Sequence, residues 1–410
     1  MSTVDVAVAI SQAQREQWAR VVAALTRRFG DLDIAEEAAA EALANAVERW
    51  PADGVPPNPG AWLTTTAIHK AIDRLRRENK RDDKEKEAQM WFDDDRPELL
   101  GSIDDDRLRL IFTCCHPALA LEARVALTLR MVGGLTVTEI ARAFLVQEGA
   151  IGQRITRAKA KISAARVPYR LPSAEDLPAR VSGVLAVLYL VFNEGYLATG
   201  PDTDPVRHEL TAEAIRLTRL IRALMPDDGE VAGLLALMLL TEARRNARVS
   251  ATGELTTLDE QDRGAWDAAL ITEGHRLVRE RLATGLAPGR YQILAAINAV
   301  HTSAHDIRDT DWSQVVALYD LLVRLDPSPI IVLNRAIAVA ELDGPEVALT
   351  AVDQLAEKLA KYHAYHATRA DLLRRLGRAQ QARAAYDQAI ELAGNTAETA
   401  ALKRRRAQLG

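Results

Sequence analysis

The stretch Gly134–Ile162, GLTVTEIARAFLVQEGAIGQRITRAKAKI, contains two short amphipathic patterns with a break between them. The first predicts a helix because apolar residues recur at i, i+3, i+4 and i+7; they are Val137, Ile140, Ala141 and Phe144. Thr136 precedes this helix and Glu139 follows three residues later, which is the spacing of a capping box. The second pattern consists of Ile151, Ile155, Ala158 and Ile162. Two short helices joined by a tight turn are typical of a helix-turn-helix.

The second helix has a basic polar face. Asp and Glu are absent from Gly149 to Ala174, whereas this stretch contains Arg154, Arg157, Lys159, Lys161, Arg166 and Arg170. Such a helix suits the major groove of DNA, and the small Gly149 and Ala150 would allow a close approach. The alternative is an ordinary helical hairpin with a solvated basic face. Leu145 stands where such turns often carry glycine, so we expect a different backbone or strain at that position.

Composition limits the class of protein. The chain has 410 residues, enough for two or three domains, and 48% of them are hydrophobic. The formal net charge is −5, so basic character is local rather than general. The adjacent Cys114 and Cys115 form neither a disulfide framework nor a CxxC pair, which fits a reducing cytoplasm. We see no signal peptide, and the longest apolar run, Val184–Phe192, is too short for a bilayer; we expect a cytoplasmic protein without a membrane partner.

The N-terminal segment predicts two helices. Ser11–Phe29 forms the first, and Gly30 ends it. Asp33 is expected to cap the second, which runs to about Trp50. The polar face of the second helix is acidic and carries Glu36, Glu37, Glu41 and Glu48. This face is either a solvated helix surface or a docking surface for a basic partner helix.

A basic helix is expected next. Pro51–Pro59 predicts a loop, because proline interrupts helices. Gly60–Arg81 then predicts a helix whose inward residues are Ala61, Thr65, Ile68, Ile72 and Leu75. Trp62 and the run Thr64–Thr66 precede a basic stem, which suits stacking of a single-stranded base and binding of its phosphate. The alternative for Trp62 is a buried aromatic residue of a surface helix.

Two further segments separate these helices from the helix-turn-helix. Asp82–Asp106 is rich in acids and predicts a linker. Cys114, Cys115 and His116 are consecutive, and three consecutive donors do not converge easily on one tetrahedral ion. We therefore interpret the cysteines as core thiols and expect no metal site.

The rest of the chain predicts a helical extension. Pro168, Pro172 and Pro178 mark its start, and its expected helices are Val181–Tyr196, Glu209–Met225, Glu230–Arg248, Glu260–Ala283 and Arg290–Ala304. Its last part repeats with a period of 34 residues, which is typical of tetratricopeptide repeats. Ala336, Val339, Leu342, Ala348, Val352 and Leu355 recur as Ala370, Leu373, Leu376, Ala382, Tyr386 and Ala389. Gly344 and Gly377 mark turns between paired helices, and a generic helical bundle is the alternative.

Together these segments resemble an extracytoplasmic-function sigma factor of the sigma-70 family, a subunit that gives bacterial RNA polymerase its promoter specificity. The resemblance is carried by AEEAAAEALANAVERW (Ala35–Trp50), GAWLTTTAIHKAIDRLRRE (Gly60–Glu78) and the helix-turn-helix. Beyond them, VLYLVFNEGY (Val187–Tyr196) and LLALMLL (Leu234–Leu240) resemble the long C-terminal extension of one subgroup.

The resemblance implies several sets of site residues. Contacts to the melted minus-ten element would come from Trp62, Thr65, Thr66, His69, Lys70, Arg74 and Arg77. Contacts to the minus-thirty-five groove would come from Glu148, Gly149, Ala150, Gln153, Arg154 and Arg157. Polymerase would be bound by Asp33, Glu36, Glu37 and Glu41. Phe192, Asn193, Glu194, Gly195 and Tyr196 would either dock the extension on the DNA-binding domains or form a structural helix end within it.

We therefore expect an all-α protein. Sigma domain 2 would span residues 1–86, an acidic linker 87–105, sigma domain 4 residues 106–167, and the extension 168–410, with tetratricopeptide-like repeats near 311–395. Its partners would be core RNA polymerase and promoter DNA, with a regulatory protein or ligand on the extension and no cofactor. The alternative is a helix-turn-helix regulator with a tetratricopeptide sensor that never joins polymerase. We expect no enzyme, because the sequence contains no Ser/His/Asp spacing, phosphate loop or metal set.

Overall fold

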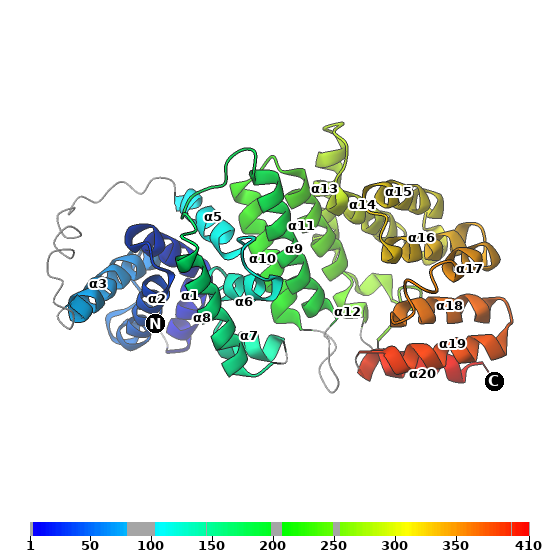
Figure 1. Ribbon diagram of the computed structural model, residues 1–410, viewed down its shortest axis with the longest axis horizontal. Coiled ribbons are helices and arrows are strands. Elements are labelled where there is room, and N and C mark those ends of the chain that lie inside the picture. The colour runs from blue at the N-terminus through cyan, green and yellow to red at the C-terminus, as the bar shows by residue number, and fades with distance from the viewer. Residues whose placement is uncertain are drawn as a thin grey trace. The chain divides into compact units, whose positions relative to one another are not determined.

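The computed structural model describes residues 3–79, 103–144, 146–197, 207–248, 255–394 and 396–409. Within these ranges the chain forms helices and no β-strand, which confirms the all-α class. The chain divides into two compact units, Met1–Leu190 and Val191–Gly410 (Figure 1). Most of the predicted acidic linker lies outside the described residues, as does Leu145 in the predicted turn.

The first unit begins with a bundle of three helices, α1 (Thr3–Phe29), α2 (Leu32–Asp53) and α3 (Pro59–Asn79), drawn in blue in Figure 1. Their shared core contains Trp18, Val22, Leu25, Ala39, Ala42, Trp50 and Leu63. Gly30 has a φ of 68°, and its N–H donates to the carbonyl of Thr26, so the predicted end of the first helix is confirmed.

Helix α2 differs from its prediction at both ends. Asp31 rather than Asp33 is its N-cap, because the Asp31 carboxylate accepts the backbone N–H groups of Asp33 and Ile34. The helix also continues through Pro51 to Asp53. A proline in the last turn removes only one helical hydrogen bond, and the carbonyl four residues earlier belongs to Val47, which is exposed.

The buried face of α3 differs in part from the predicted one. Leu63, Ala67 and Ala71 are buried. Of the predicted inward residues, Ala61 and Thr65 are exposed, and Ile68, Ile72 and Leu75 are half-buried. Small alanines at this face let α3 pack closely on α1 and α2, and this requirement outweighs the stripe of larger residues that the sequence suggested.

The first unit continues with α5 (Ile103–Cys114), α6 (Leu121–Met131), α7 (Val137–Ala143) and α8 (Glu148–Ala164), and α1 packs against both α5 and α6. Helix α5 begins inside the predicted linker, which is a correction to the boundary at residue 105. The reason lies at Asp106, which is buried and paired with Arg109 at 2.5 Å and Arg27 at 3.5 Å. An acid-rich run predicts a solvated segment only when such partners are missing.

The two cysteines lie in the core of this unit. Cys114 and Cys115 are free and buried, and Cys115 contacts the hydroxyl of Thr128 at 3.3 Å. Burial raises the pKa of the Cys115 thiol to about 11, so it stays protonated near neutral pH. These properties fit the interpretation as core thiols.

Helix α9 (Leu177–Tyr196) is longer than the apolar run within it. By length and composition alone its 20 residues are enough to cross a membrane, although the nine residues of the run Val184–Phe192 are not. Its buried residues include Val184, Leu185, Val187, Leu188, Val191 and Phe192. Within its most apolar window, 39% is buried inside the structure, and core helices of globular proteins can have the same length and apolar composition.

The second unit is a succession of helices: α10 (His208–Leu224), α11 (Gly229–Glu242), α12 (Arg245–Arg248), η2 (Arg263–Ala265), α13 (Ala268–Leu282), α14 (Arg290–Ser303), η3 (Ile307–Asp309), α15 (Trp312–Leu325), α16 (Pro329–Leu342), α17 (Pro345–Asp353), α18 (His363–Arg375), α19 (Ala379–Leu392) and α20 (Thr396–Ala407). Helix α11 is its central element, because every residue from Val231 to Glu242 is buried. Its neighbours are α10, α13 and α14 (Figure 1).

The 34-residue period corresponds to two successive helix pairs, α16 with α17 and α18 with α19. Equivalent residues of both pairs enter one core, among them Ala336, Val339, Ala348, Val352, Ala370, Leu373, Ala382, Tyr386 and Ala389. Gly344 and Gly377 have φ angles of 93° and 72° in the turns between α16 and α17 and between α18 and α19, as predicted. Leu342 breaks the equivalence, because 45% of its surface is exposed.

Candidate nucleic-acid interface

Helices α7 and α8 form the predicted helix-turn-helix. The capping box is present, because the N–H of Thr136 donates to Glu139 at 2.7 Å and the N–H of Glu139 donates to the Thr136 hydroxyl at 3.1 Å. The apolar stripe of α8 is buried as expected and consists of Ile151, Ile155, Ala158 and Ile162. The sequence therefore predicted both the start of α7 and the inner face of α8.

The outer face of α8 holds the predicted groove residues. Glu148, Gly149, Ala150, Gln153 and Arg157 are exposed, and Arg154 is half-buried. A side chain added at Gly149 would meet no atom within 4 Å, so the first turn is open to a ligand. Helix N-termini favour phosphate because their first N–H groups point outward. The face can therefore contact both a phosphate backbone and base edges.

One basic residue of α8 points the other way. Lys159 is buried, with 8% of its side chain exposed, and its ammonium group donates to Asp33 at 2.7 Å and also to Glu36. Arg130 at the end of α6 donates to the other Glu36 oxygen at 2.5 Å. We call Lys159, Arg130, Asp33 and Glu36 the α2–α8 ion cluster. It joins the acidic helix to the helix-turn-helix, a contact that the sequence did not reveal.

Trp18 adds an apolar and hydrogen-bonded contact beside this cluster. Its indole Nε1–H donates to the carbonyl of Arg130 at 3.1 Å, and the Arg130 guanidinium lies 5.5 Å from the ring centroid. Gly134 has a φ of 74°, and a Cβ there would lie 2.9 Å from Trp18. The sequence gave no sign that Trp18 anchors the segment before α7.

The candidate minus-ten residues lie on α3. Thr65, His69 and Arg77 are exposed, whereas Thr66 is half-buried. Trp62 is half-buried and packs edge-on against the buried Trp50, with ring centroids 5.5 Å apart. This geometry includes parts of both interpretations, because the indole contacts Trp50 while Trp62 as a whole is only half-buried.

The acids and bases expected to bind different partners are paired with each other. Lys70 lies 3.6 Å from Glu41, and Arg74 forms an ion pair with Glu37. With the ion cluster included, each of the four acids proposed for polymerase has a basic partner within the first unit. Breaking the more exposed pairs to bind a new partner costs little free energy. Breaking the pair of Glu36 and Lys159 costs more, because it would leave a buried charge without a partner.

The segment Phe192–Tyr196 is built into the second unit. Glu194 pairs with Arg207 at 3.2 Å, and the Arg248 guanidinium lies over the Tyr196 ring at 3.3 Å from its centroid. Gly195 lies inside α9, which continues to Tyr196. Its role is close packing: a Cβ there would lie 2.6 Å from the backbone nitrogen of Thr211. These contacts fit the helix-end alternative, and docking onto the DNA-binding domains stays a prediction.

Comparisons with known proteins agree with this organisation. Residues 16–81 match the family described as sigma-70 region 2, and residues 109–162 match sigma-70 region 4. Residues 180–282 match a family of unknown function, DUF6596. An uncharacterized protein of Rhizobium meliloti (strain 1021) is 45% identical over 391 residues, which cover 94% of this chain and 92% of that protein. No solved structure matches the chain.

The exposed helix-turn-helix, together with the match to sigma-70 region 4, defines a DNA-binding protein with a role in transcription. The chain belongs to the same family as the rhizobial protein, and its regions 2 and 4 make it a protein of the sigma-70 family. Proteins of this kind regulate transcription by binding rather than by catalysis.

Proposed function

We propose that this protein is an extracytoplasmic-function sigma factor that binds core RNA polymerase in the cytoplasm and directs initiation at specific promoters. The observation that carries the proposal is the exposed outer face of α8 in a chain that also contains the basic helix α3. Arg157 and Gln153 would contact the minus-thirty-five groove, and Trp62 would stack on a base of the opened strand. The helical extension, with its tetratricopeptide-like tail, would modulate these contacts.

We further propose that the packed first unit is the resting form. The minus-ten and minus-thirty-five elements are about 25 base pairs apart, or roughly 85 Å at 3.4 Å per base pair. Lys159 and Glu36 are in direct contact, so the two DNA-reading regions do not reach both elements while the α2–α8 ion cluster is intact. Polymerase would offer basic groups to Asp33 and Glu36 and thereby replace Lys159 and Arg130.

Run-off transcription tests this proposal. Full-length protein and core polymerase should produce a transcript from a promoter that neither yields alone. A charge reversal at Glu41 should reduce co-purification with polymerase. The protein should stay folded, because the ion pair that Glu41 forms with Lys70 is accessible to solvent. Binding to promoter DNA without any association with core polymerase would refute the sigma function.

The pairing of all four acids favours a second candidate, a helix-turn-helix regulator that acts without polymerase. In that protein the acids would serve only to hold the first unit together. Co-purification with core polymerase separates the two functions, because the regulator has no use for it.

A further inference from the structure

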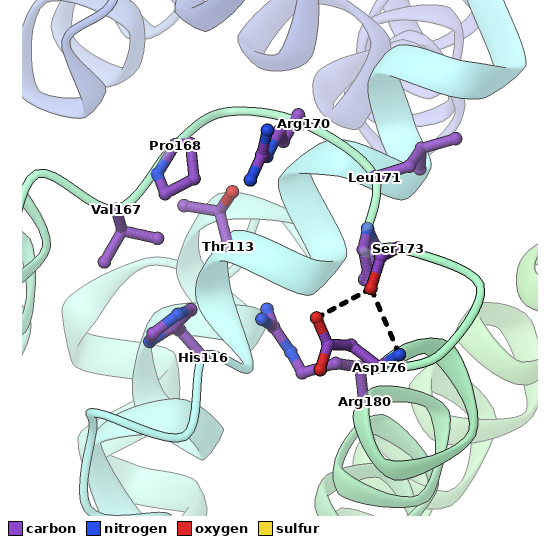
Figure 2. Close-up of a pocket in the computed structure, with 10 residues that line it drawn as sticks. Thr113, His116, Val167, Pro168, Arg170, Leu171, Ser173, Asp176 and Arg180 are labelled. Carbon is purple, nitrogen blue, oxygen red and sulfur yellow. Dashed lines mark hydrogen bonds between the residues drawn. The ribbon is translucent and has the colours of Figure 1, made fainter.

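A cavity of about 350 Å³ lies in the first unit, next to the chain segment that leaves the helix-turn-helix. Its walls come from the end of α5, the loop after it, residues 167–173 and the start of α9 (Figure 2). Ligand pockets in proteins usually measure about 300–1,000 Å³, so this volume suits a small molecule. None of the predicted site residues lines it, and the proposed sigma function does not use it.

Three basic side chains line the cavity, of which Arg170 is exposed and Arg180 and His116 are half-buried. Figure 2 shows their side chains around one space. Arg180 uses Nη2 to donate to the carbonyl of Phe112 at 2.5 Å, while its buried Nε–H has no acceptor. A buried donor without an acceptor is costly, and an anionic ligand would supply one.

His116 adds a neutral donor. Its Nδ1 accepts the backbone N–H of Ala118 at 3.2 Å, so the proton of the neutral ring is on Nε2. Burial and the charges of Arg180 and Arg124 lower the pKa of His116, so the ring is neutral near pH 7. The one carboxylate among the lining residues belongs to Asp176, which accepts the Ser173 hydroxyl at 2.8 Å. The two guanidinium groups therefore leave a net positive charge.

The remaining wall is apolar and rigid. Val167, Pro168, Leu171 and Pro172 supply it, and the two prolines restrict the backbone of this segment. A wall of this kind gives room for a short aliphatic group next to the basic end. An inorganic ion alone would leave this wall in contact with water.

We propose that this cavity binds a small organic anion, a carboxylate or phosphate monoester with a short aliphatic part, through Arg170, Arg180 and His116. The neighbouring Tyr169 hydroxyl donates at 3.0 Å to the carbonyl of Asp106 and lies 3.2 Å from that of Ala23, so the same segment ties α1 to α5. We infer, on the basis of the proposed sigma function, that a bound anion would hold the first unit in its packed form.

Isothermal titration of the full-length chain tests the site with butyl phosphate, butyrate and inorganic phosphate, at constant ionic strength. Butyl phosphate or butyrate should bind more tightly than inorganic phosphate, and the better of the two identifies the anionic group. Arg170→Gln should weaken that binding by about tenfold, because a charge-assisted hydrogen bond is lost. The matched control Lys161→Gln removes an exposed charge outside the cavity and should leave affinity unchanged.

Arg180→Lys keeps the charge but loses the Nε–H donor, and it should weaken binding while circular dichroism shows an intact fold. Equal binding by the Arg170 and Lys161 variants would mean attraction to general surface charge and would overturn the proposal. The proposal would also be overturned if inorganic phosphate bound as tightly as butyl phosphate, or if none of the three probes bound. These measurements need no polymerase, so their outcome is independent of the transcription test.

Discussion

Lys159 lies on the helix that carries the DNA-reading residues, yet its ammonium group donates to Asp33 of the acidic helix at 2.7 Å and is buried. A buried lysine needs acceptors because the loss of hydration costs several kcal/mol. Glu36 supplies the second acceptor and also receives Arg130. The two regions that would bind polymerase and DNA therefore stabilise each other in the free protein.

A double-mutant cycle should detect this coupling. Glu36→Gln is expected to lower the free energy of unfolding by about 1–3 kcal/mol, because Lys159 and Arg130 lose a charged acceptor. Lys159→Met, which removes the buried charge, should make the effect of Glu36→Gln smaller by about 0.5–3 kcal/mol. Urea unfolding measures both quantities.

Glu48→Gln is the control for this cycle, since Glu48 is exposed on the same helix and should change stability by less than about 0.5 kcal/mol. Additive effects of the Glu36 and Lys159 substitutions would show that the pair does not hold the unit together.

The helix-turn-helix was predictable because its signals are local. The box of Thr136 and Glu139 and the stripe from Ile151 to Ile162 depend only on spacing along one helix. The ion cluster was not predictable, because Lys159 and Glu36 are 123 residues apart and each has the spacing of a solvated residue. A lysine close to the edge of an apolar stripe was the one available signal, and long side chains often reach solvent from there.

The errors on α2 and α3 have a similar origin. Two aspartates, Asp31 and Asp33, both fit a cap, and only the backbone geometry selects the first. On α3 two faces contain apolar residues. The face with Leu63, Ala67 and Ala71 is the buried one, because it is in contact with the two neighbouring helices. Local patterns predict that a helix exists more reliably than which of two faces is buried.

Removal of the exposed Arg157 should alter DNA binding in a way that salt reveals. Each phosphate contact contributes about 0.9 to the slope of log affinity against log salt concentration, so Arg157→Ala should flatten that slope by about one. Arg20→Ala, an exposed arginine on α1, is the matched control and should keep the slope. An unchanged slope for Arg157→Ala would show that Arg157 does not contact phosphate. If the affinity for DNA were also unchanged, α8 would not be the helix that reads DNA.

Trp62 should have separable roles in stability and in opening of DNA. Trp62→Ala removes an edge-on contact with Trp50 worth about 0.5–1.5 kcal/mol beyond the lost area, and should also reduce permanganate reactivity of promoter thymines. Trp62→Phe keeps most of the contact and an aromatic face, so both properties should largely recover. Full thymine reactivity with the alanine variant would reject a stacking role and leave Trp62 as a packing residue.

Gly195 tests whether the Phe192–Tyr196 segment is structural. Gly195→Ala places a methyl group 2.6 Å from the Thr211 nitrogen and 2.9 Å from the Arg207 carbonyl, so stability should fall by about 1–3 kcal/mol. Gly152→Ala on α8 meets no atom within 4 Å and should instead raise stability, by about 1 kcal/mol. Thermal unfolding that shows no loss for Gly195→Ala would mean that the start of α10 moves freely away from α9.

His301 should make the second unit sensitive to acid. The residue is half-buried, and this partial burial together with the charges of Arg244 and Arg263 lowers its pKa from 6.5 to about 4. His301 of the unfolded chain is therefore protonated as the pH falls through 6.5, whereas His301 of the folded protein is protonated only near pH 4. The stabilisation is complete above pH 6.5 and is lost as the pH falls towards 4, by about 3 kcal/mol in total.

Urea unfolding across this range should show the loss of stability, and His301→Gln should reduce that loss. The exposed His305 is the control, because His305→Gln should leave the pH dependence as it is. An identical acid profile for the His301 and His305 variants would show that His301 is already protonated, or free to become so, in the folded protein.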